Sequence, residues 1–398
     1  MTNINAPKIR FEGFTDAWEQ RKIGEFLEES KIPGSDGSIA KKLTVKLWGK
    51  GVIPKEEIYK GSASTNYYIR KQGQFIYGKL DFLNQAFGII PKELDGYEST
   101  LDSPAFDILQ GLNAKYFLEY VSRKEFYLFQ GTIANGSRRA KRIHSDTFFN
   151  MPIVLPSIEE QEKIGKFFDT LDDTIALQKR KLVLLKEQKK GFLQKMFPKA
   201  GEKFPELRFE GFTDGWEQRK LGDITESYSG GTPSAGNKLY YGGNIPFIRS
   251  GEINDDKTEL FITEDGLNNS SAKMVSKGDI LYALYGATSG EVGISRINGA
   301  INQAILAIKP KDNDDPYLIT QWLKKQKESI IATYLQGGQG NLSGSIVKEL
   351  TLQLPIDKNE QQKIGAFFKS LDDAIALQES KLEKLKEVKK GFLQKIFV

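Results

Sequence analysis

Two segments that each occur twice in this 398-residue chain most constrain how it can fold. The opening segment reads RFEGFTDAWEQRK at residues 10–22 and RFEGFTDGWEQRK at residues 208–220. The helix segment, which begins EQEKIGKFFDTLDD at residue 160 and EQQKIGAFFKSLDD at residue 360, extends to residues 197 and 397. The blocks between them look little alike. Because an internal repeat marks a repeated structural unit, the chain should form two equivalent halves, each a constant frame around a divergent block.

Each helix segment carries a row of residues whose spacing alternates between four and three. Sustained over the segment, this 3.5-residue period predicts a coiled-coil seam. The apolar seam positions are Ile164, Phe168, Leu171, Ile175, Leu182, Leu185, Phe192 and Met196, and in the second copy Ile364, Phe368, Leu371, Ile375, Leu382, Leu385, Phe392 and Ile396. Gln178 and Lys189, matched by Gln378 and Lys389, fill the remaining places.

Two unrelated amphipathic helices, each packed on its own domain, are the simpler interpretation of these segments. Identical seams with matched polar positions instead favour two helices of one chain that pair with each other, the polar residues fixing the register. At 1.5 Å per residue such a helix spans about 50 Å, so the pair would separate two globular units. Ser157 with Glu160, and Asp357 with Glu360, have the spacing of a capping box at each helix start.

The divergent blocks have patterns of short strands broken by glycine, asparagine and proline, with some helix. Residues 278–310 predict strands around tight turns, and residues 316–335 an amphipathic helix with proline at its start. Residues 73–83 can be laid over residues 278–288, and residues 103–108 then fall near residues 302–307. The blocks are therefore expected to share a mixed α/β fold. At about 130 residues, each is large enough for its own core.

We expect the domains to run as follows: opening segment and first block at 1–158, central helix and linker at 159–205, second opening segment and block at 206–356, and the last helix at 357–398.

Composition excludes several classes of protein. The chain has no cysteine, so it lacks a disulfide framework, thiolate zinc sites and a cysteine nucleophile, and its single histidine leaves no His pair for a metal. No apolar run reaches the about 18–20 residues of a membrane span. Because the first residues lack the apolar core of a signal peptide, a cytoplasmic protein is expected. A net charge of +5 gives weak attraction to polyanions and decides nothing alone.

No motif for catalysis emerges. Residues 230–236 and 285–293 are glycine-rich, but they lack the GK[ST] of a P-loop and a G-x-G-x-x-G between strand and helix, so they predict turns. The acidic pair Asp172-Asp173, repeated at residues 372–373, falls on the polar side of its helix, where a solvated face or a partner contact explains it. Asp315-Pro316-Tyr317 resembles part of a DNA amino-methyltransferase motif but lacks its second proline.

Two stretches suit DNA better. GSRRAKR at residues 136–142 holds four basic residues near the end of the first block, and GGQGNLSGS at residues 337–345 takes the equivalent place in the second. Arginine donates bidentately to guanine or phosphate, whereas Gln and Asn suit adenine edges. The alternative is a solvated basic loop and an ordinary polar loop. Residue types alone do not separate base readout from phosphate contact.

With frame and blocks laid out, the chain resembles the specificity (S) subunits of type I restriction-modification systems over nearly its whole length. The most specific elements are WEQRKLGD at 216–223, YYGGNIPFIRSGEI at 240–253, GQGNLSGSIVKELTLQLP at 338–355 and the helix segment that follows. The first block departs more from the family pattern, and positions before residue 73 align poorly.

The resemblance implies two target recognition domains, each reading one half of a bipartite DNA sequence, separated by a pair of long antiparallel coiled-coil helices with an internal pseudo-twofold repeat. It implies two methyltransferase (M) subunits and two restriction (R) subunits as partners. S-adenosylmethionine, ATP and Mg would then belong to the partners, and this chain would bind no cofactor and catalyse nothing. Because the two blocks differ, the two half-sites should differ.

By family position, the candidate DNA contacts of the first domain are Lys79, Arg138, Arg139, Lys141 and Arg142. Those of the second are Arg249, Ser250, Tyr285, Thr288, Gln339, Asn341 and Ser343. Trp18 and Trp216 are predicted to pack at equivalent junctions and not to contact DNA.

Three other interpretations stay open. The first is a coiled-coil adaptor whose two globular domains bind proteins, without salt-dependent DNA affinity. The second is an autonomous enzyme, which the missing motifs disfavour. The third is a specificity subunit that serves a methyltransferase alone, without a restriction partner.

Overall fold

The computed structural model describes residues 7–56, 62–132, 136–137, 140–335 and 341–397. The chain divides into two compact units. Unit 1 comprises Met1–Lys179 with Ser380–Val398, and unit 2 comprises Arg180–Glu379. Each unit therefore contains one divergent block, the first part of one long helix and the last part of the other.

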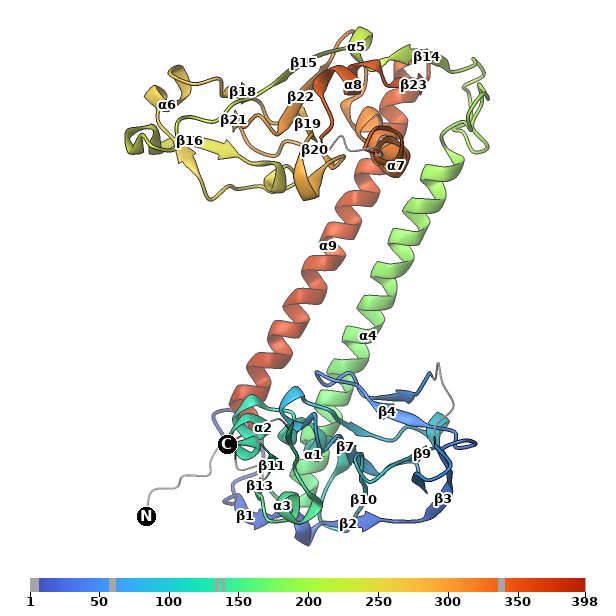
Figure 1. Cartoon of the computed structure of the whole chain (residues 1–398), viewed down its shortest axis with the longest axis vertical. Helices are drawn as coiled ribbons and strands as arrows, with labels where there is room; N and C mark the ends of the chain where they lie inside the picture. Colours follow the sequence, from blue (N-terminus) through green and yellow to red (C-terminus); the bar gives the residue numbers. More distant parts are fainter. Residues whose placement is uncertain (1–6, 57–61, 133–135, 138–139, 336–340, 398) are drawn as a thin grey trace. The chain divides into compact units, whose positions relative to one another are not determined.

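Unit 1 contains short antiparallel strands and several short helices (Figure 1). Its strands are β1 (Glu19–Lys22), β2 (Leu27–Ser30), β3 (Pro33–Asp36), β4 (Leu43–Val45), β5 (Val52–Pro54), β6 (Asn66–Ile69), β7 (Phe75–Tyr77), β8 (Phe87–Ile89), β9 (Glu98–Ser99), β10 (Ala105–Ile108), β11 (Gly136–Ser137), β12 (Ala140–Lys141) and β13 (Pro152–Leu155). Its helices before the long one are η1 (Ile23–Glu25), η2 (Phe82–Asn84), η3 (Lys92–Leu94), α1 (Ala114–Val121), α2 (Lys124–Gly131) and α3 (Ser145–Phe149).

Unit 2 has the same kind of elements, some of them longer. Its strands are β14 (Glu217–Lys220), β15 (Thr225–Ser229), β16 (Tyr241–Ile248), β17 (Phe261–Ile262), β18 (Lys273–Val275), β19 (Ile280–Ala283), β20 (Val292–Ile294), β21 (Gly299–Ile301), β22 (Ile305–Pro310) and β23 (Thr351–Leu354). Its helices are α5 (Leu221–Ile224), η4 (Lys238–Tyr240), η5 (Ser250–Glu252), α6 (Glu264–Asn268), η6 (Gly286–Thr288), α7 (Pro316–Tyr334) and α8 (Gly344–Glu349). The strands and the proline-started helix expected here are confirmed.

A four-stranded sheet of one and the same order organises both units. It runs β2-β10-β7-β8 in unit 1 and β15-β22-β19-β20 in unit 2. Strands β7 and β19 hold the same place in it, which supports laying residues 73–83 over residues 278–288. In the neighbouring strand, Ala105 lies opposite Ile76 and Ala307 lies opposite Leu281, so Ala105 and Ala307 are equivalent. The sequence alignment of residues 103–108 with residues 302–307 is therefore three residues out of register. The mixed α/β fold with an internal repeat is therefore confirmed.

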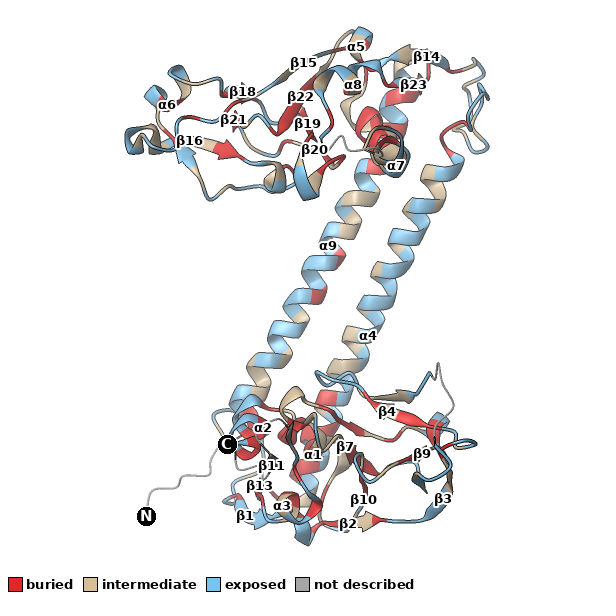
Figure 2. Cartoon of the chain, in the orientation of Figure 1, coloured by how far each residue is buried: buried red, intermediate tan, exposed pale blue. Residues whose placement is uncertain are grey.

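The long helices are α4 (Ile158–Lys195) and α9 (Lys358–Ile396). Within each unit the two run antiparallel side by side: Phe167 stacks edge-on against Phe392 in unit 1, and Phe367 against Phe192 in unit 2, each at a centroid distance of 4.9 Å. All of the predicted seam residues are buried or half-buried, whereas many of the other residues along the middle of the long helices are exposed (Figure 2). The coiled-coil prediction is confirmed.

Both ends of each long helix join a domain core. Ile164 and Phe168 at the start of α4, with Ile396 and Phe397 at the end of α9, belong to the core that contains Trp18. The equivalent residues of the other helix ends join the core around Trp216 in unit 2. Both tryptophans are at most 3% exposed, so their predicted packing role is confirmed.

The capping-box prediction is half right. Ser157 Oγ accepts the Glu160 N–H at 3.3 Å, and Asp357 Oδ1 accepts the Asn359 N–H at 2.8 Å, so both caps form. The glutamates do not turn back to the cap. Glu160 instead receives Arg10 Nε and Nη2 of the opening segment, at 2.8 and 2.7 Å, and Glu360 binds Arg208 in the same way. These glutamates are 1% exposed, so the pair fixes the opening segment to the helix start.

A glutamine and a glycine that recur near the start of each long helix position a helix of the preceding block. Gln361 Oε1 accepts the Asp315 N–H at 3.0 Å, and Gln161 Oε1 accepts the Asn113 N–H at the same distance. Asp315 and Asn113 are the N-cap residues of α7 and α1. A Cβ at Gly365 would lie 2.1 Å from the Asp315 carboxylate. Glycine is thus needed here because the capping side chain lies directly against the helix backbone.

The acidic pairs differ from the expectation of a solvated face. Asp172 receives Lys389 Nζ at 2.7 Å and Lys115 Nζ at 2.6 Å, and Lys389 also reaches Glu119. In unit 2 the Asp372 carboxylate accepts hydrogen bonds from the seam residue Lys189 and from the hydroxyl of Tyr317, each at 2.6 Å. The first acid of each pair therefore links the polar seam position to the block's helix, because that helix packs over it. Asp173 and Asp373 are exposed, as expected.

Candidate nucleic-acid interface

The ends of the two candidate DNA-binding stretches, residues 136–142 and 337–345, are attached to the same place in the repeated sheet. The Ile143 N–H donates to the Lys79 carbonyl at 3.0 Å, and the Leu342 N–H donates to the Leu284 carbonyl at the same distance. Lys79 and Leu284 follow the equivalent strands β7 and β19. Each loop thus ends beside the tip of the β7–β8 or β19–β20 hairpin, which makes the two tips equivalent sites with different side chains.

In unit 1 the candidate side chains at the tip are basic. Lys79 is half-buried, and burial lowers the pKa of its ammonium group, while nearby Glu29 and Asp102 oppose that shift. Arg142 is exposed, and its Nη1 lies 3.1 Å from Asp102 Oδ1. Lys141 pairs through its backbone with Gly136 in the β11–β12 ribbon. Arg138 and Arg139 lie outside the described residues.

In unit 2 the candidate side chains at the tip are polar and uncharged. Tyr285 and Asn341 form an isolated antiparallel bridge, which brings the end of the second loop onto the hairpin. Thr288 Oγ1 donates to the Tyr285 carbonyl at 3.3 Å, and the Ser343 hydroxyl accepts the Ile346 N–H as the N-cap of α8. Four sequence candidates are thus brought together. Gln339 lies outside the described residues.

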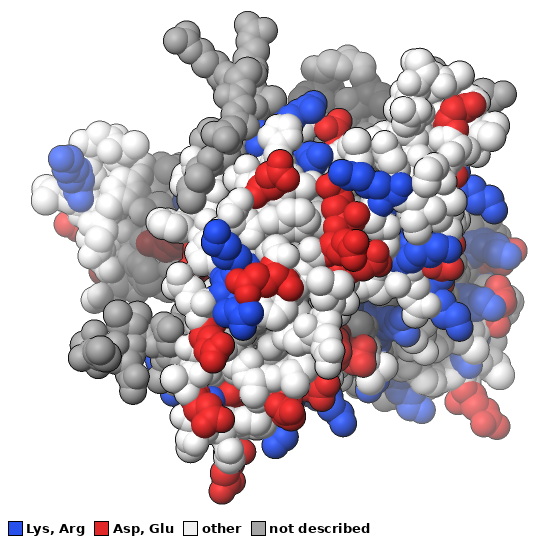
Figure 3. Space-filling model, turned by 90° about the horizontal axis from the view of Figure 1, so that it is seen from below, with Lys and Arg blue, Asp and Glu red and all other residues white. Residues whose placement is uncertain are grey.

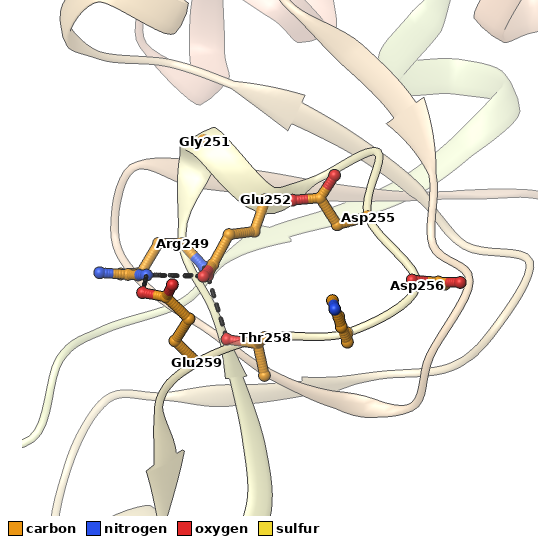
Figure 4. Close-up of a pocket in the computed structure, with 8 residues that line it drawn as sticks. Arg249, Gly251, Glu252, Asp255, Asp256, Thr258 and Glu259 are labelled. Atoms are coloured by element: carbon orange, nitrogen blue, oxygen red, sulfur yellow. Dashed lines mark hydrogen bonds and ion pairs between the residues drawn. The ribbon is translucent and has the colours of Figure 1, made fainter. Parts of the chain in front are cut away.

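Arg249 and Ser250 lie elsewhere in unit 2, where β16 ends and η5 begins. Arg249 is exposed and ion-paired with Glu252 and Glu259 on the rim of a cleft of about 790 Å³ (Figure 4). The hydrogen bonds that the Arg249 guanidinium donates to the Glu252 carboxylate raise the pKa of Arg249. The carboxylates were missed in the sequence, although the R-S-G-E spacing, which places an acid three residues after the arginine, was the available signal.

The charges elsewhere are mixed. On the face of the molecule that Figure 3 displays, Lys and Arg side chains lie among Asp and Glu side chains and do not form one basic field. Among the described residues no group of three or more His, Asp or Glu could hold a metal ion. None of the helices in the described parts of the chain is long and apolar enough to span a membrane.

The chain thus has two α/β domains with the same sheet order, joined by a repeated pair of antiparallel helices. The two domains differ in the candidate side chains at one matched hairpin tip. These features define a protein with two recognition domains. Residues 15–187 and 213–387 match the model of the type I restriction modification DNA specificity domain. The chain belongs to this family.

Relatives with assigned names support the same family. The chain is 24% identical over 293 residues to the putative type I restriction enzyme MjaX specificity subunit of Methanocaldococcus jannaschii, and this match covers 70% of this chain and 65% of the relative. With the MjaIX specificity subunit of the same organism it shares 30% identity over 181 residues, which cover 44% of this chain and 41% of the relative. The chain thus spans less than two thirds of the length of these two relatives.

The fold has solved counterparts. The S subunit of a type I restriction-modification system from M. genitalium superposes with a TM-score of 0.65 at 14% identity, covering 98% of this chain and 99% of that one. A chain from a structure of type I R-M complex assembly gives a TM-score of 0.54 at 18% identity, covering 96% and 97%. At these identities the likeness shows a shared fold over the full length.

Proposed function

We propose that this chain is the DNA sequence-specificity subunit of a type I restriction-modification enzyme and is itself non-catalytic. The observation that carries the proposal is the contrast between frame and tips. The helices, the opening segments and their Arg–Glu pairs are the same in both units. The candidate side chains at the matched hairpin tips, by contrast, are basic in one unit and uncharged in the other. A protein that presents two different surfaces on one duplicated frame suits a bipartite target with unlike halves.

The two tips are the proposed DNA contacts. Lys79, Lys141 and Arg142, with Arg138 and Arg139, would meet one half-site, and basic side chains of this kind suit phosphates or guanine. Tyr285, Thr288, Asn341 and Ser343, with Gln339, would meet the other, where an amide suits an adenine edge. Arg249 and Ser250, which lie elsewhere in unit 2, would add further contacts. The proposed domains are residues 1–158 and 206–356 for recognition, with 159–205 and 357–398 as the helices and linker.

The duplicated frame would meet two copies of one partner, since a pseudo-twofold repeat offers the same surface twice. The partners proposed are two methyltransferase subunits and two restriction subunits. S-adenosylmethionine, ATP and Mg are then assigned to those partners. The two recognition domains would contact one side of a duplex about one helical turn, ~34–36 Å, apart.

Paired substitutions at the two tips test this proposal. We expect Arg138→Ala and Asn341→Ala, made in the chain assembled with its methyltransferase subunit, each to weaken binding by roughly 1–3 kcal/mol if the side chain reads a base, and to affect only its own half-site. DNA affinity should also fall steeply with salt. If neither substitution changed DNA affinity or the methylation pattern, the assignment of the tips would be wrong.

The alternative function is a coiled-coil adaptor with two protein-binding domains. It predicts no salt-dependent affinity for DNA, so the same titration separates the two.

A further inference from the structure

Arg249 in unit 2 lies between two carboxylates of very different exposure (Figure 4). Its Nη2 donates to Glu252 Oε1 at 2.6 Å and its Nε to Glu252 Oε2 at 3.2 Å. Its Nη2 also lies 3.3 Å from Glu259 Oε2. The Glu252 side chain is 12% exposed and the Glu259 side chain 90% exposed. One carboxylate therefore belongs to the fold, and the other is a solvent-facing neighbour.

Glu252 is fixed from several sides. Besides the guanidinium, its Oε2 accepts the Arg249 backbone N–H at 3.0 Å and the Thr258 hydroxyl at 3.1 Å, and the same hydroxyl lies 2.9 Å from the Phe247 carbonyl. Burial disfavours the charged form of Glu252, but these hydrogen bonds outweigh burial, and its pKa falls to about 2. The carboxylate is thus ionised near neutral pH and holds the guanidinium in one orientation.

A guanidinium has five N–H donors in a rigid fork, and Glu252 occupies only its Nε side. The donors on Nη1 and the second donor on Nη2 face outward, where Glu259 is the only carboxylate among the described residues recorded in contact with them. An exposed pair of this kind is worth little, because water and salt screen it. A phosphate can therefore replace Glu259 while Glu252 stays in place.

We propose that Arg249 is a preset phosphate-binding residue of the second recognition domain, that Glu252 is its positioning residue, and that Glu259 is a competing carboxylate which DNA must displace. This inference rests on the proposed function. The competitor lowers affinity for every duplex, so that stable binding requires the additional contacts of the correct half-site. Specificity is a difference of affinities, and an opposing charge contributes to it as well as an attraction does.

Two substitutions of equal charge, at the two carboxylates, should have opposite effects. Glu259→Gln should tighten binding of a mixed-sequence duplex by roughly twofold to fivefold, as expected for loss of one exposed competing charge. Glu252→Gln should weaken binding by about tenfold, since it loosens the guanidinium. Asp256→Asn is the matched control, because Asp256 lies in the same loop and no contact to Arg249 is recorded for it among the described residues. It should change affinity less than Glu259→Gln does.

The assay is fluorescence anisotropy of a labelled mixed-sequence duplex, titrated with the full chain assembled with its methyltransferase subunits. Glu252→Asp should restore part of the affinity lost in Glu252→Gln, and an unchanged melting temperature would show that the variants fold. In an Arg249→Ala background, Glu259→Gln should change affinity no more than Asp256→Asn does, because its effect requires the guanidinium.

The outcomes are separable. If the unaltered assembly bound no DNA, the proposed function itself would fail. If it bound DNA but Glu259→Gln and Glu252→Gln shifted affinity in the same direction and by the same amount as Asp256→Asn, only the present inference would be refuted. A change in assembly with the methyltransferase subunit, seen by size exclusion without a change in DNA affinity, would assign Arg249 to a protein contact and overturn it as well.

Discussion

Gly365 in helix α9 provides a prediction of unusual sign. Replacing a helix-interior glycine with alanine ordinarily stabilises a helix by about 1 kcal/mol. At Gly365 the new Cβ would lie 2.1 Å from Asp315 Oδ1, and that oxygen caps helix α7 by accepting the Leu318 N–H at 2.7 Å. The carboxylate therefore has to leave its capping position, or the helices have to separate.

The expected cost follows from these terms. Loss of the cap costs about 1 kcal/mol and overpacking about 2 kcal/mol, which the alanine propensity offsets by about 1 kcal/mol. Gly365→Ala should thus destabilise unit 2 by about 2 kcal/mol. For a unit of this size that corresponds to a fall in Tm of roughly 4–8 °C.

Gly191→Ala is the matched control, because Gly191 is also helical and in unit 2, and its Cβ would meet nothing within 4 Å. That substitution should leave Tm unchanged or raise it slightly. Differential scanning calorimetry of the full chain measures both variants. A Gly365→Ala variant as stable as Gly191→Ala would refute the reasoning that the repeated glycine exists to admit the capping side chain.

Three further tests probe the frame, each by calorimetry of the full chain. Arg208→Met should destabilise unit 2 by about 3 kcal/mol, because it leaves Glu360 buried and unpaired, and a loss below about 1 kcal/mol would contradict an anchoring role. Phe368→Ala, at a fully buried ring, should cost about 3–5 kcal/mol, whereas half-exposed Phe367→Ala should cost clearly less; equal losses would argue against the described packing. Burial opposes the ionisation of Asp372, but hydrogen bonds from Lys189 and Tyr317 outweigh the burial and lower the pKa of Asp372. The stability that the ionised Asp372 adds is therefore present above its ordinary pKa of 3.8 and is lost as the pH falls below that value. Asp372→Asn should therefore reduce the loss of stability on acidification below about pH 4, and an unchanged pH profile would speak against that ion pair.

The sequence was sufficient for the frame because its signals are local and periodic. The seam from Ile164 to Ile175 follows from a 3.5-residue period, and the caps Ser157 and Asp357 from residue type and position. The partners of Glu160 were not predictable in this way, since Arg10 is distant in sequence and a capping box has the same local pattern.

Asp172 illustrates a second limit of the sequence. Helical periodicity placed it on the polar side, but the block's helix α1 covers that side and supplies Lys115, which no helix pattern of α4 reveals. The candidate tips could be matched across the repeat, and the structure brings Tyr285 and Asn341 together. Which side chains contact DNA depends on surfaces formed by several segments, so residue types alone do not decide it.

The central claim is that one chain carries two unlike DNA-reading domains on a duplicated frame. Genome-wide mapping of modified adenines, in cells that express this chain with the proposed methyltransferase partner, tests that claim most directly. We predict a single bipartite motif with two different half-sites separated by an unspecific spacer. Methylation without sequence preference, or no methylation that depends on this chain, would contradict it.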